Sequence, residues 1–188
     1  MLIIGITGTL GAGKGTAVDH LVSAKGLAHC SARAYLIEQL EKRGMPASRD
    51  TILWMANALR KEHSPSFLAE ELLDQAERGG RDAVIESLRS PGEVALLRAK
   101  NKDFMLLAIK ANQRLRYERI HARNSETDRG VTFEKFQQDE RNESEREEAW
   151  ASNLPKTMLL ADHTIENDGT KEELNAAIDR FVAARIQS

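Results

Sequence analysis

A glycine-rich segment close to the N-terminus constrains this chain more than any other feature. Residues 8–16, Gly-Thr-Leu-Gly-Ala-Gly-Lys-Gly-Thr, directly follow a short apolar run at residues 2–7 and precede a stretch with helical periodicity. A GxxxxGK loop between a strand and a helix is the context in which such a loop binds phosphate. The glycines let backbone N–H groups converge on phosphate oxygens, and the helix N-terminus adds the positive end of its dipole. The sequence therefore predicts a nucleotide phosphate site made by Gly8, Gly11, Ala12, Gly13, Lys14, Gly15 and Thr16.

The end of this loop departs from the general pattern. Lys14 is expected to bridge the β- and γ-phosphates and to follow the transferring charge, which makes it a candidate catalytic residue. A serine or threonine that binds magnesium normally comes directly after the lysine, but here Gly15 stands there and Thr16 follows. A Gly-Lys-Gly-Thr ending resembles the adenylate kinase branch. That resemblance implies that Thr16 contacts a phosphate and that magnesium is held largely through water and phosphate.

Short apolar segments that alternate with helical patterns predict an α/β fold with a parallel sheet. Strands are predicted at residues 2–7, 27–30, 83–85, 104–109 and 161–166, and helices at about 14–24, 35–42, 52–59, 67–73, from 91, 113–123 and from 171. Residues 90–93 and 170–173 resemble capping boxes that open two of these helices. We expect one domain, residues 1–188, in which helices flank a five-stranded parallel sheet. A helical insertion at about 31–79 and a short polar lid at about 124–150 follow the carboxyl ends of strands, where open α/β sheets bind ligands.

The composition narrows the classes of function. The formal net charge of −2 argues against a chain built mainly to hold nucleic acid, because such a chain needs a basic face. No run approaches the roughly eighteen apolar residues of a membrane span, and the N-terminus lacks the basic segment of a secretion signal. The one cysteine, Cys30, cannot form an intramolecular disulfide or a CxxC metal site. We expect a cytoplasmic protein whose partner is a small molecule, not nucleic acid or a membrane.

Charged residues follow the third predicted strand. Glu86 ends this strand, and Arg89 comes three residues later. A carboxylate beside a phosphate loop can organise magnesium, directly or through water, or a hydroxyl acceptor, and an arginine can bind a phosphate with two parallel hydrogen bonds. The alternative is an ordinary solvated strand end. Two aromatic residues of the insertion, Tyr35 and Trp54, either line a pocket for the base of an acceptor or belong to the core.

The same segment resembles part of the nucleoside monophosphate kinases, where an Asp-Gly-Phe-Pro-Arg motif occupies this place and its arginine grips the acceptor phosphate. Glu86 and Arg89 resemble the two ends of that motif. Arg33, just after the second strand, and Arg60, at the end of an inserted helix, stand where that family places further arginines. The resemblance implies that Arg33, Arg60 and Arg89 bind the phosphate of the acceptor.

Four arginines crowd the helix predicted at 113–123: Arg114, Arg116, Arg119 and Arg123. The last three share one helix face, where they repel one another unless an anion such as a triphosphate joins them. The alternative is a surface helix balanced by Glu118 and by later acidic residues.

Two segments near the predicted lid resemble adenine-binding parts of adenylate kinases. Arg-Ile-His-Ala-Arg, residues 119–123, is similar to the segment that opens their lid. This similarity implies that Arg119 stacks on adenine, that Arg123 reaches phosphate, and that the closed lid excludes water. Arg141 and Arg146 are further candidates to add positive charge there. Asp-Gly-Thr at 168–170 is similar to a turn that meets adenine through backbone groups, which implies such a role for Gly169; a plain turn before a helix is the alternative.

Taken together, the chain resembles adenylate kinase and dephospho-coenzyme-A kinase within the P-loop kinases. Segments 57–60, 85–89 and 161–170 are also similar to an uncharacterised group of archaeal and bacterial P-loop proteins near dephospho-coenzyme-A kinase. The resemblance implies the P-loop kinase fold, with an acceptor-binding insertion, and ATP and Mg²⁺ as cofactors. It further implies transfer of the γ-phosphate of ATP to a (deoxy)nucleoside monophosphate. One alternative is a hydroxyl acceptor of the dephospho-coenzyme-A kind. Another is a binding protein that uses ATP as a switch, transfers nothing, and has no need of acceptor-side arginines.

Overall fold

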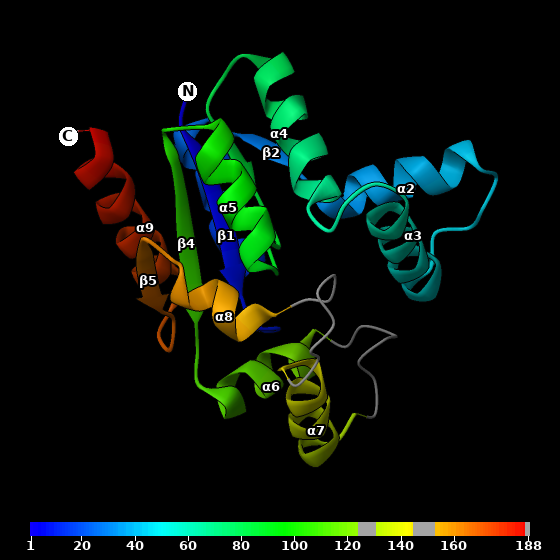
Figure 1. Cartoon of the computed structure of the whole chain (residues 1–188). Helices are drawn as coiled ribbons and strands as arrows, with labels where there is room; N and C mark the ends of the chain where they lie inside the picture. Colours follow the sequence, from blue (N-terminus) through cyan, green and yellow to red (C-terminus); the bar gives the residue numbers. More distant parts are fainter. Residues whose placement is uncertain (124–130, 145–152, 187–188) are drawn as a thin grey trace.

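The computed structural model of the chain describes residues 1–123, 131–144 and 153–186. Within these residues the strands lie in the order β2-β3-β1-β4-β5, and all neighbours are parallel (Figure 1). The predicted α/β fold with a five-stranded parallel sheet is thus confirmed, and β1 lies at the centre of the sheet. The strand bounds are β1 (Ile3–Gly8), β2 (Ala28–Cys30), β3 (Ala83–Ile85), β4 (Phe104–Lys110) and β5 (His163–Glu166).

Helices cover both faces of the sheet because the side chains of each strand alternate between the faces. Ile4 and Ile6 of β1 belong to a core cluster with α1 and α9, whereas Ile3 belongs to a cluster with α4 and α5. Because β1 is the central strand, the loop that follows it emerges at the middle of the carboxyl edge of the sheet. The four covering helices are α1 (Lys14–Lys25), α4 (Phe67–Gly79), α5 (Pro91–Lys100) and α9 (Lys171–Ile186).

Two helices of the predicted insertion stand beside the sheet: α2 (Ala32–Lys42) and α3 (Arg49–Glu62) (Figure 1). The side chains of Ser31 and Ser48 cap their first turns, and α2 begins earlier than the predicted residue 35 because Ser31 caps it. The predicted insertion, residues 31–79, also contains α4. Because α4 covers the sheet, only α2 and α3 stand off it. These helices share a third core cluster with α4: Leu36, Leu40, Met55, Ala56, Leu59 and Leu68.

Three further helices follow β4: α6 (Gln113–Ala122), α7 (Phe133–Ser144) and α8 (Leu154–Leu159). The sequence predicts α6 but neither α7 nor α8. In contrast to the expected polar lid, α7 buries Phe136, whose ring centroid lies 5.9 Å from that of Tyr117 on α6. This part of the predicted lid therefore has a small core of its own. Residues 124–130 and 145–150 of the predicted lid, Arg146 among them, lie outside the described residues.

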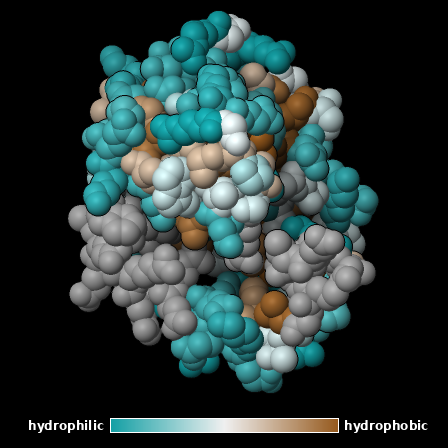
Figure 2. All heavy atoms as spheres, turned by 90° about the vertical axis from the view of Figure 1, so that its right-hand side faces the viewer, coloured by the Kyte–Doolittle hydropathy of each residue, from teal (hydrophilic) through white to brown (hydrophobic). Residues whose placement is uncertain are grey.

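The surface seen from the side of α2 and α3 is largely hydrophilic, and its hydrophobic residues form small separate spots (Figure 2). Exposed large hydrophobic side chains of α3 include Leu53 and Trp54. Within the described ranges, no helix combines the length and the apolar character that a membrane span requires.

Candidate functional site

The glycine-rich loop connects β1 to α1 through a backbone that glycine adopts most readily. Gly11 and Gly13 have φ angles of 78° and 102°, in the left-handed region. A Cβ on Gly13 would lie 2.3 Å from Asn167 Nδ2. Gly13 is also the N-cap of α1 and has no side chain with which to cap its first turn. A helix N-terminus of this kind suits a phosphate, because the positive end of the helix dipole lies there.

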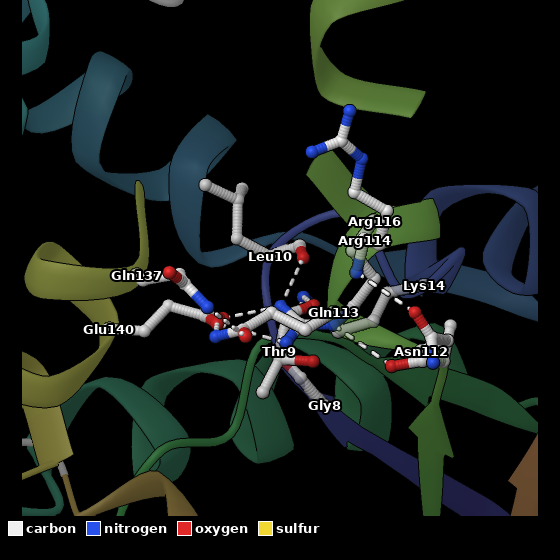
Figure 3. Close-up of polar contacts among 11 residues, drawn as sticks. Gly8, Thr9, Leu10, Lys14, Asn112, Gln113, Arg114, Arg116, Gln137 and Glu140 are labelled. Atoms are coloured by element: carbon white, nitrogen blue, oxygen red, sulfur yellow. Dashed lines mark hydrogen bonds and ion pairs between the residues drawn. The ribbon is translucent and has the colours of Figure 1, made fainter. Parts of the chain in front are cut away.

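Long cationic side chains hold the loop from its carbonyl side (Figure 3). Lys14 Nζ donates hydrogen bonds to the carbonyl oxygens of Gly8 and Thr9, at 2.8 and 2.9 Å. Arg116 Nη1 donates to the carbonyl oxygen of Leu10 at 3.0 Å. These carbonyl oxygens are therefore satisfied inside the protein, and the loop is fixed in shape before any ligand binds.

Arg116 is buried on α6 and its charge is balanced by an acidic residue of α7. Its Nη2 donates to Glu140 Oε2 at 2.9 Å, its Nη1 donates to Glu140 Oε1, and its Nε donates to the carbonyl of Ala111 at 3.0 Å. For Arg116, the predicted face joined by an anion is therefore wrong, and the alternative of a helix balanced by later acidic residues is correct. Its partner comes from a helix that the sequence did not reveal.

Arg119 lies against the turn that follows β5. Its Nη1 donates to the carbonyl of Asn167 at 2.8 Å, and its Nη2 donates to that of Gly169 at 3.1 Å. The structure thus brings together the two residues predicted to meet adenine. The buried side chain of Asn167 donates from Nδ2 to the carbonyl of Ala12 in the phosphate loop at 2.8 Å. Arg123 is exposed at the end of α6.

A cavity of about 490 Å³ opens beside the phosphate loop. The loop, the carboxyl ends of β4 and β5, and helices α6, α7 and α8 all contribute to its lining. Its volume falls within the range of small-ligand pockets, roughly 300–1,000 Å³. The apolar part of the lining includes Leu10 and Met158, and the polar part includes Asn112, Glu166 and Asp168.

On the β3 side of the loop, one buried carboxylate contacts the backbone of Arg89 and the guanidinium of Arg60. Glu93 Oε2 accepts the backbone N–H groups of Arg89 at 2.8 Å and of Ser90 at 3.0 Å, and Glu93 Oε1 lies 3.6 Å from Arg60 Nη2. Arg60 is half-buried and Arg89 is exposed. Arg33 is exposed in the first turn of α2, and no contact within the described residues joins it to the other two arginines.

Glu86 follows β3 and is half-buried. Ser31 Oγ donates to Glu86 Oε1 at 3.0 Å, and His29 Nε2 lies 3.2 Å from the same oxygen. Across the described part of the chain, no three His, Cys, Asp or Glu side chains gather in a way that could hold a metal ion. The carboxylate of Glu86 is a group that can contact magnesium directly or through water.

The two aromatic residues considered for a base pocket lie in different surroundings. Tyr35 packs against the core clusters of α4 and of the insertion, and burial, followed by nearby Glu71, raises the pKa of its phenol. Trp54 is 52% exposed on α3. The alternative that assigned Tyr35 to the core is therefore correct, whereas Trp54 lies at the surface.

Comparisons with known proteins place the chain in a family. A family model described as an AAA domain matches residues 4–151. The chain belongs to this AAA-domain family. Its relatives include UPF0200 protein PH1008 of Pyrococcus horikoshii, 29% identical over 188 residues that cover 97% of this chain and 96% of the relative. Another is UPF0200 protein MJ1399 of Methanocaldococcus jannaschii, 28% identical over 185 residues that cover 97% and 89% of the two chains.

Solved structures share the fold of this AAA-domain chain at low sequence identity. TT1252 from Thermus thermophilus is 22% identical with a TM-score of 0.60, and the match covers 97% of both chains. Shikimate kinase from Acinetobacter baumannii, in complex with shikimate, is 15% identical with a TM-score of 0.63, covering 98% of this chain and 94% of the other. The fold is therefore that of P-loop kinases.

Sequence reasoning missed two organising residues of this AAA-domain chain. Asn167 directly precedes the Asp-Gly-Thr turn, and its position after an apolar strand is the only local signal of its contact with the phosphate loop. Glu93 was predicted only as a capping residue. Its place beside the buried Val94 and Leu97 was a signal that this carboxylate is buried and needs a cationic partner.

Proposed function

We propose that the protein is an ATP-dependent phosphotransferase that moves the γ-phosphoryl group of ATP to a (deoxy)nucleoside monophosphate. The observation that carries the proposal is the position of the phosphate loop between two basic regions. On the β4–β5 side, Arg119 contacts the turn at Gly169. On the β3 side, Glu93 accepts the backbone N–H of Arg89 and lies 3.6 Å from the guanidinium of Arg60. This arrangement supplies separate cationic groups for the phosphates of a donor and of an acceptor.

In the donor half, Lys14 is the residue that follows the transferring charge. It now donates to two carbonyl oxygens of its own loop, and in the ATP complex it would turn to the β- and γ-phosphate oxygens. Thr16, in the first turn of α1, would contact a phosphate, and Arg123 would reach one from the end of α6. Magnesium bound with ATP neutralises phosphate charge, and Glu86 would contact it through water.

In the acceptor half, the arginines would hold the phosphate of the monophosphate in line with the γ-phosphate. That phosphate is already an ionised nucleophile, so orientation matters more than a base. Glu93 fixes the backbone at Arg89 and lies beside the guanidinium of Arg60, which keeps both arginines on the same side of the loop. Arg33, in the first turn of α2, is proposed as a third ligand.

A hydroxyl acceptor is the second candidate, and the geometry of Glu86 favours it. One of its oxygens is held by Ser31 and His29, which fixes the carboxylate at the carboxyl edge of the sheet. A fixed carboxylate there could orient an attacking alcohol or take its proton.

A screen with γ-labelled ATP tests the proposal. The purified protein is incubated with magnesium and with separate panels of nucleoside monophosphates and of alcohols that include dephospho-coenzyme A. We expect the label in a nucleoside diphosphate, and Lys14→Ala purified in the same way measures contaminating kinases. Label in an alcohol product would support the second candidate. ATP binding without transfer to any acceptor would instead favour the ATP-switched binding protein.

A further inference from the structure

Three polar side chains from the carboxyl ends of β2 and β3 meet on one face of the sheet: His29, Ser31 and Glu86. In the parallel pairing of β2 with β3, His29 lies opposite Val84 and Cys30 opposite Ile85, so the next positions along are Ser31 and Glu86. His29 and Ser31 are two residues apart and therefore point to the same face. Val84 points into the core cluster that contains α1, and the same alternation directs Glu86 to the α1 face, where the phosphate loop begins its helix.

The contacts of Glu86 divide its two oxygens. Oε1 accepts a hydrogen bond from Ser31 Oγ at 3.0 Å and lies 3.2 Å from His29 Nε2. Both contacts are to Oε1, and no contact within the described residues involves Oε2. The carboxylate is 21% exposed at its side chain, so it is restrained by the protein and still open to a ligand.

The backbone beyond Glu86 is strained, and the strain is held in place by buried hydrogen bonds. Ser87 has a φ of 64°, which a residue with a Cβ rarely adopts. The next residue is fixed on both sides, because Leu88 N donates to the carbonyl of Ile6 at 3.1 Å and its own carbonyl accepts the buried hydroxyl of Thr7 at 2.8 Å. Strain of this kind is kept mainly where it positions a functional group, and the group positioned here is the carboxylate of Glu86.

We propose that Glu86, positioned by Ser31 and His29, binds an alcohol hydroxyl of the acceptor through Oε2. An ionised carboxylate accepts hydrogen bonds through about four lone pairs on its two oxygens, so Oε2 can accept from a hydroxyl as well as from the magnesium-bound water proposed above. Glu86 lies three residues before Arg89, the proposed ligand of the acceptor phosphate, and the sugar hydroxyls are the hydrogen-bond donors of a nucleoside monophosphate nearest to that phosphate. This inference rests on the proposed function, and for a nucleoside monophosphate the group is a sugar hydroxyl. This hydroxyl is the one at C2′ or the one at C3′ of the sugar, and an acceptor that lacks it should be used less well.

The test compares kcat/KM for a ribonucleoside monophosphate with the values for its 2′-deoxy and 3′-deoxy analogues. We expect wild type to prefer the ribonucleotide over at least one analogue by about tenfold or more, since a hydrogen bond to a charged group is lost. Ser31→Ala should reduce this preference by raising the KM of the ribonucleotide, with little change for the discriminated analogue. Ser31→Thr keeps a hydroxyl and should restore the preference.

Ser48→Ala is the matched control, because Ser48 caps α3 as Ser31 caps α2 but makes no contact with Glu86. Similar melting temperatures of the two alanine variants, with a changed preference only in Ser31→Ala, support the proposal. Equal use of the ribonucleotide and both analogues by wild type overturns the inference and leaves the proposed function intact. The same preference in Ser31→Ala as in wild type also overturns it. No transfer to any monophosphate overturns the proposed function, and this inference with it.

Discussion

Gly13 lies so close to the side chain of Asn167 that the phosphate loop can pack on the turn after β5 only because residue 13 has no Cβ. Gly13→Ala would place a Cβ 2.3 Å from Asn167 Nδ2 on a residue whose φ is 102°. We expect the free energy of unfolding to fall by about 1–3 kcal/mol, measured by urea unfolding, and ATP binding measured by calorimetry to weaken. Gly15→Ala is the control for stability alone, because its Cβ meets nothing within 4 Å. As a helical position it should gain roughly 0.5–1 kcal/mol, and an equal loss in both variants would contradict this account.

Two capping glutamates, one buried and one exposed, allow the contribution of a buried charge to stability to be measured. Glu93 and Glu173 each accept the N–H of the residue that begins their capping box, but Glu93 is buried and lies beside Arg60, whereas Glu173 is exposed. Glutamine retains an acceptor and removes the charge. Glu93→Gln should therefore lower the free energy of unfolding by about 1–3 kcal/mol and raise the KM of the acceptor, while Glu173→Gln should change the free energy by about 0.5 kcal/mol or less. Equal losses of unfolding free energy in the two variants, measured with urea, would show that neither burial nor Arg60 makes Glu93 more stabilising than Glu173.

The sequence predicts single residues well where their role is local. The phosphate loop is recognisable because its glycines, its lysine and its flanking elements lie within one short segment. Arg116 could not be told apart from Arg119 and Arg123, since all three share one face of the helix predicted at 113–123. The acid that neutralises Arg116 lies on α7, 24 positions further along the chain. The role of Asn167 is even harder to predict from the sequence, because its partner Ala12 is 155 positions away.

Among the elements, α7 is attached to α6 through a buried ion pair whose exposed counterpart offers a control. Glu140 pairs with Arg116, whose side chain is 7% exposed, whereas Glu118 pairs with Arg114, which is 62% exposed. Glu140→Gln should loosen α7, because Arg116 loses its countercharge in a buried place; we expect a loss of about 1–3 kcal/mol. Hydrogen exchange of α7 amides should become faster. Glu118→Gln should cost about 0.5 kcal/mol or less and leave α7 unchanged, and equal exchange in both variants would contradict the assigned role of Glu140.

Elements with a strong local pattern were predicted, and those that depend on distant partners were not. The strands of the sheet are apolar runs, and α5 has a capping box with Pro91 at its start, so both are visible in the sequence. Helix α7 has few apolar residues, and they pack on Tyr117 of α6, which the pattern of α7 alone does not reveal. Helix α8 has only six residues, too few for a helical period to show.

For the whole molecule, the strand order decides which groups meet at the phosphate loop. β1 is central, with β3 and β2 on one side and β4 and β5 on the other. Residues after β2 and β3, including Glu86 and Arg89, therefore lie on one side of Lys14, while Arg119 and the turn at Gly169 lie on the other. The sequence predicts these residues singly, but their division between two sides follows only from the order of the strands.

This division predicts how three variants separate in steady-state kinetics. Arg89→Lys keeps the charge but loses the two-pronged hydrogen bond to a phosphate, so it should raise the KM of the acceptor by about tenfold and leave that of ATP nearly unchanged. Arg119→Ala should raise the KM of ATP by about tenfold or more, because a contact at the donor base is lost. Lys14→Ala should reduce kcat by orders of magnitude in a folded protein, because the lysine acts on charge that develops during transfer.

Arg98→Lys is the matched control for these variants. Arg98 lies on α5 and contacts Asp162 and the carbonyl of Leu160, away from the phosphate loop, so both KM values should stay as in wild type. Initial rates measured over a grid of ATP and acceptor concentrations give all the constants from one data set. A rise in the KM of ATP for Arg89→Lys, or of the acceptor for Arg119→Ala, would mean that the two substrates occupy the opposite sides. Equal changes in both constants would mean that the sides act as one site, because a residue that binds only one substrate leaves the affinity for the other intact.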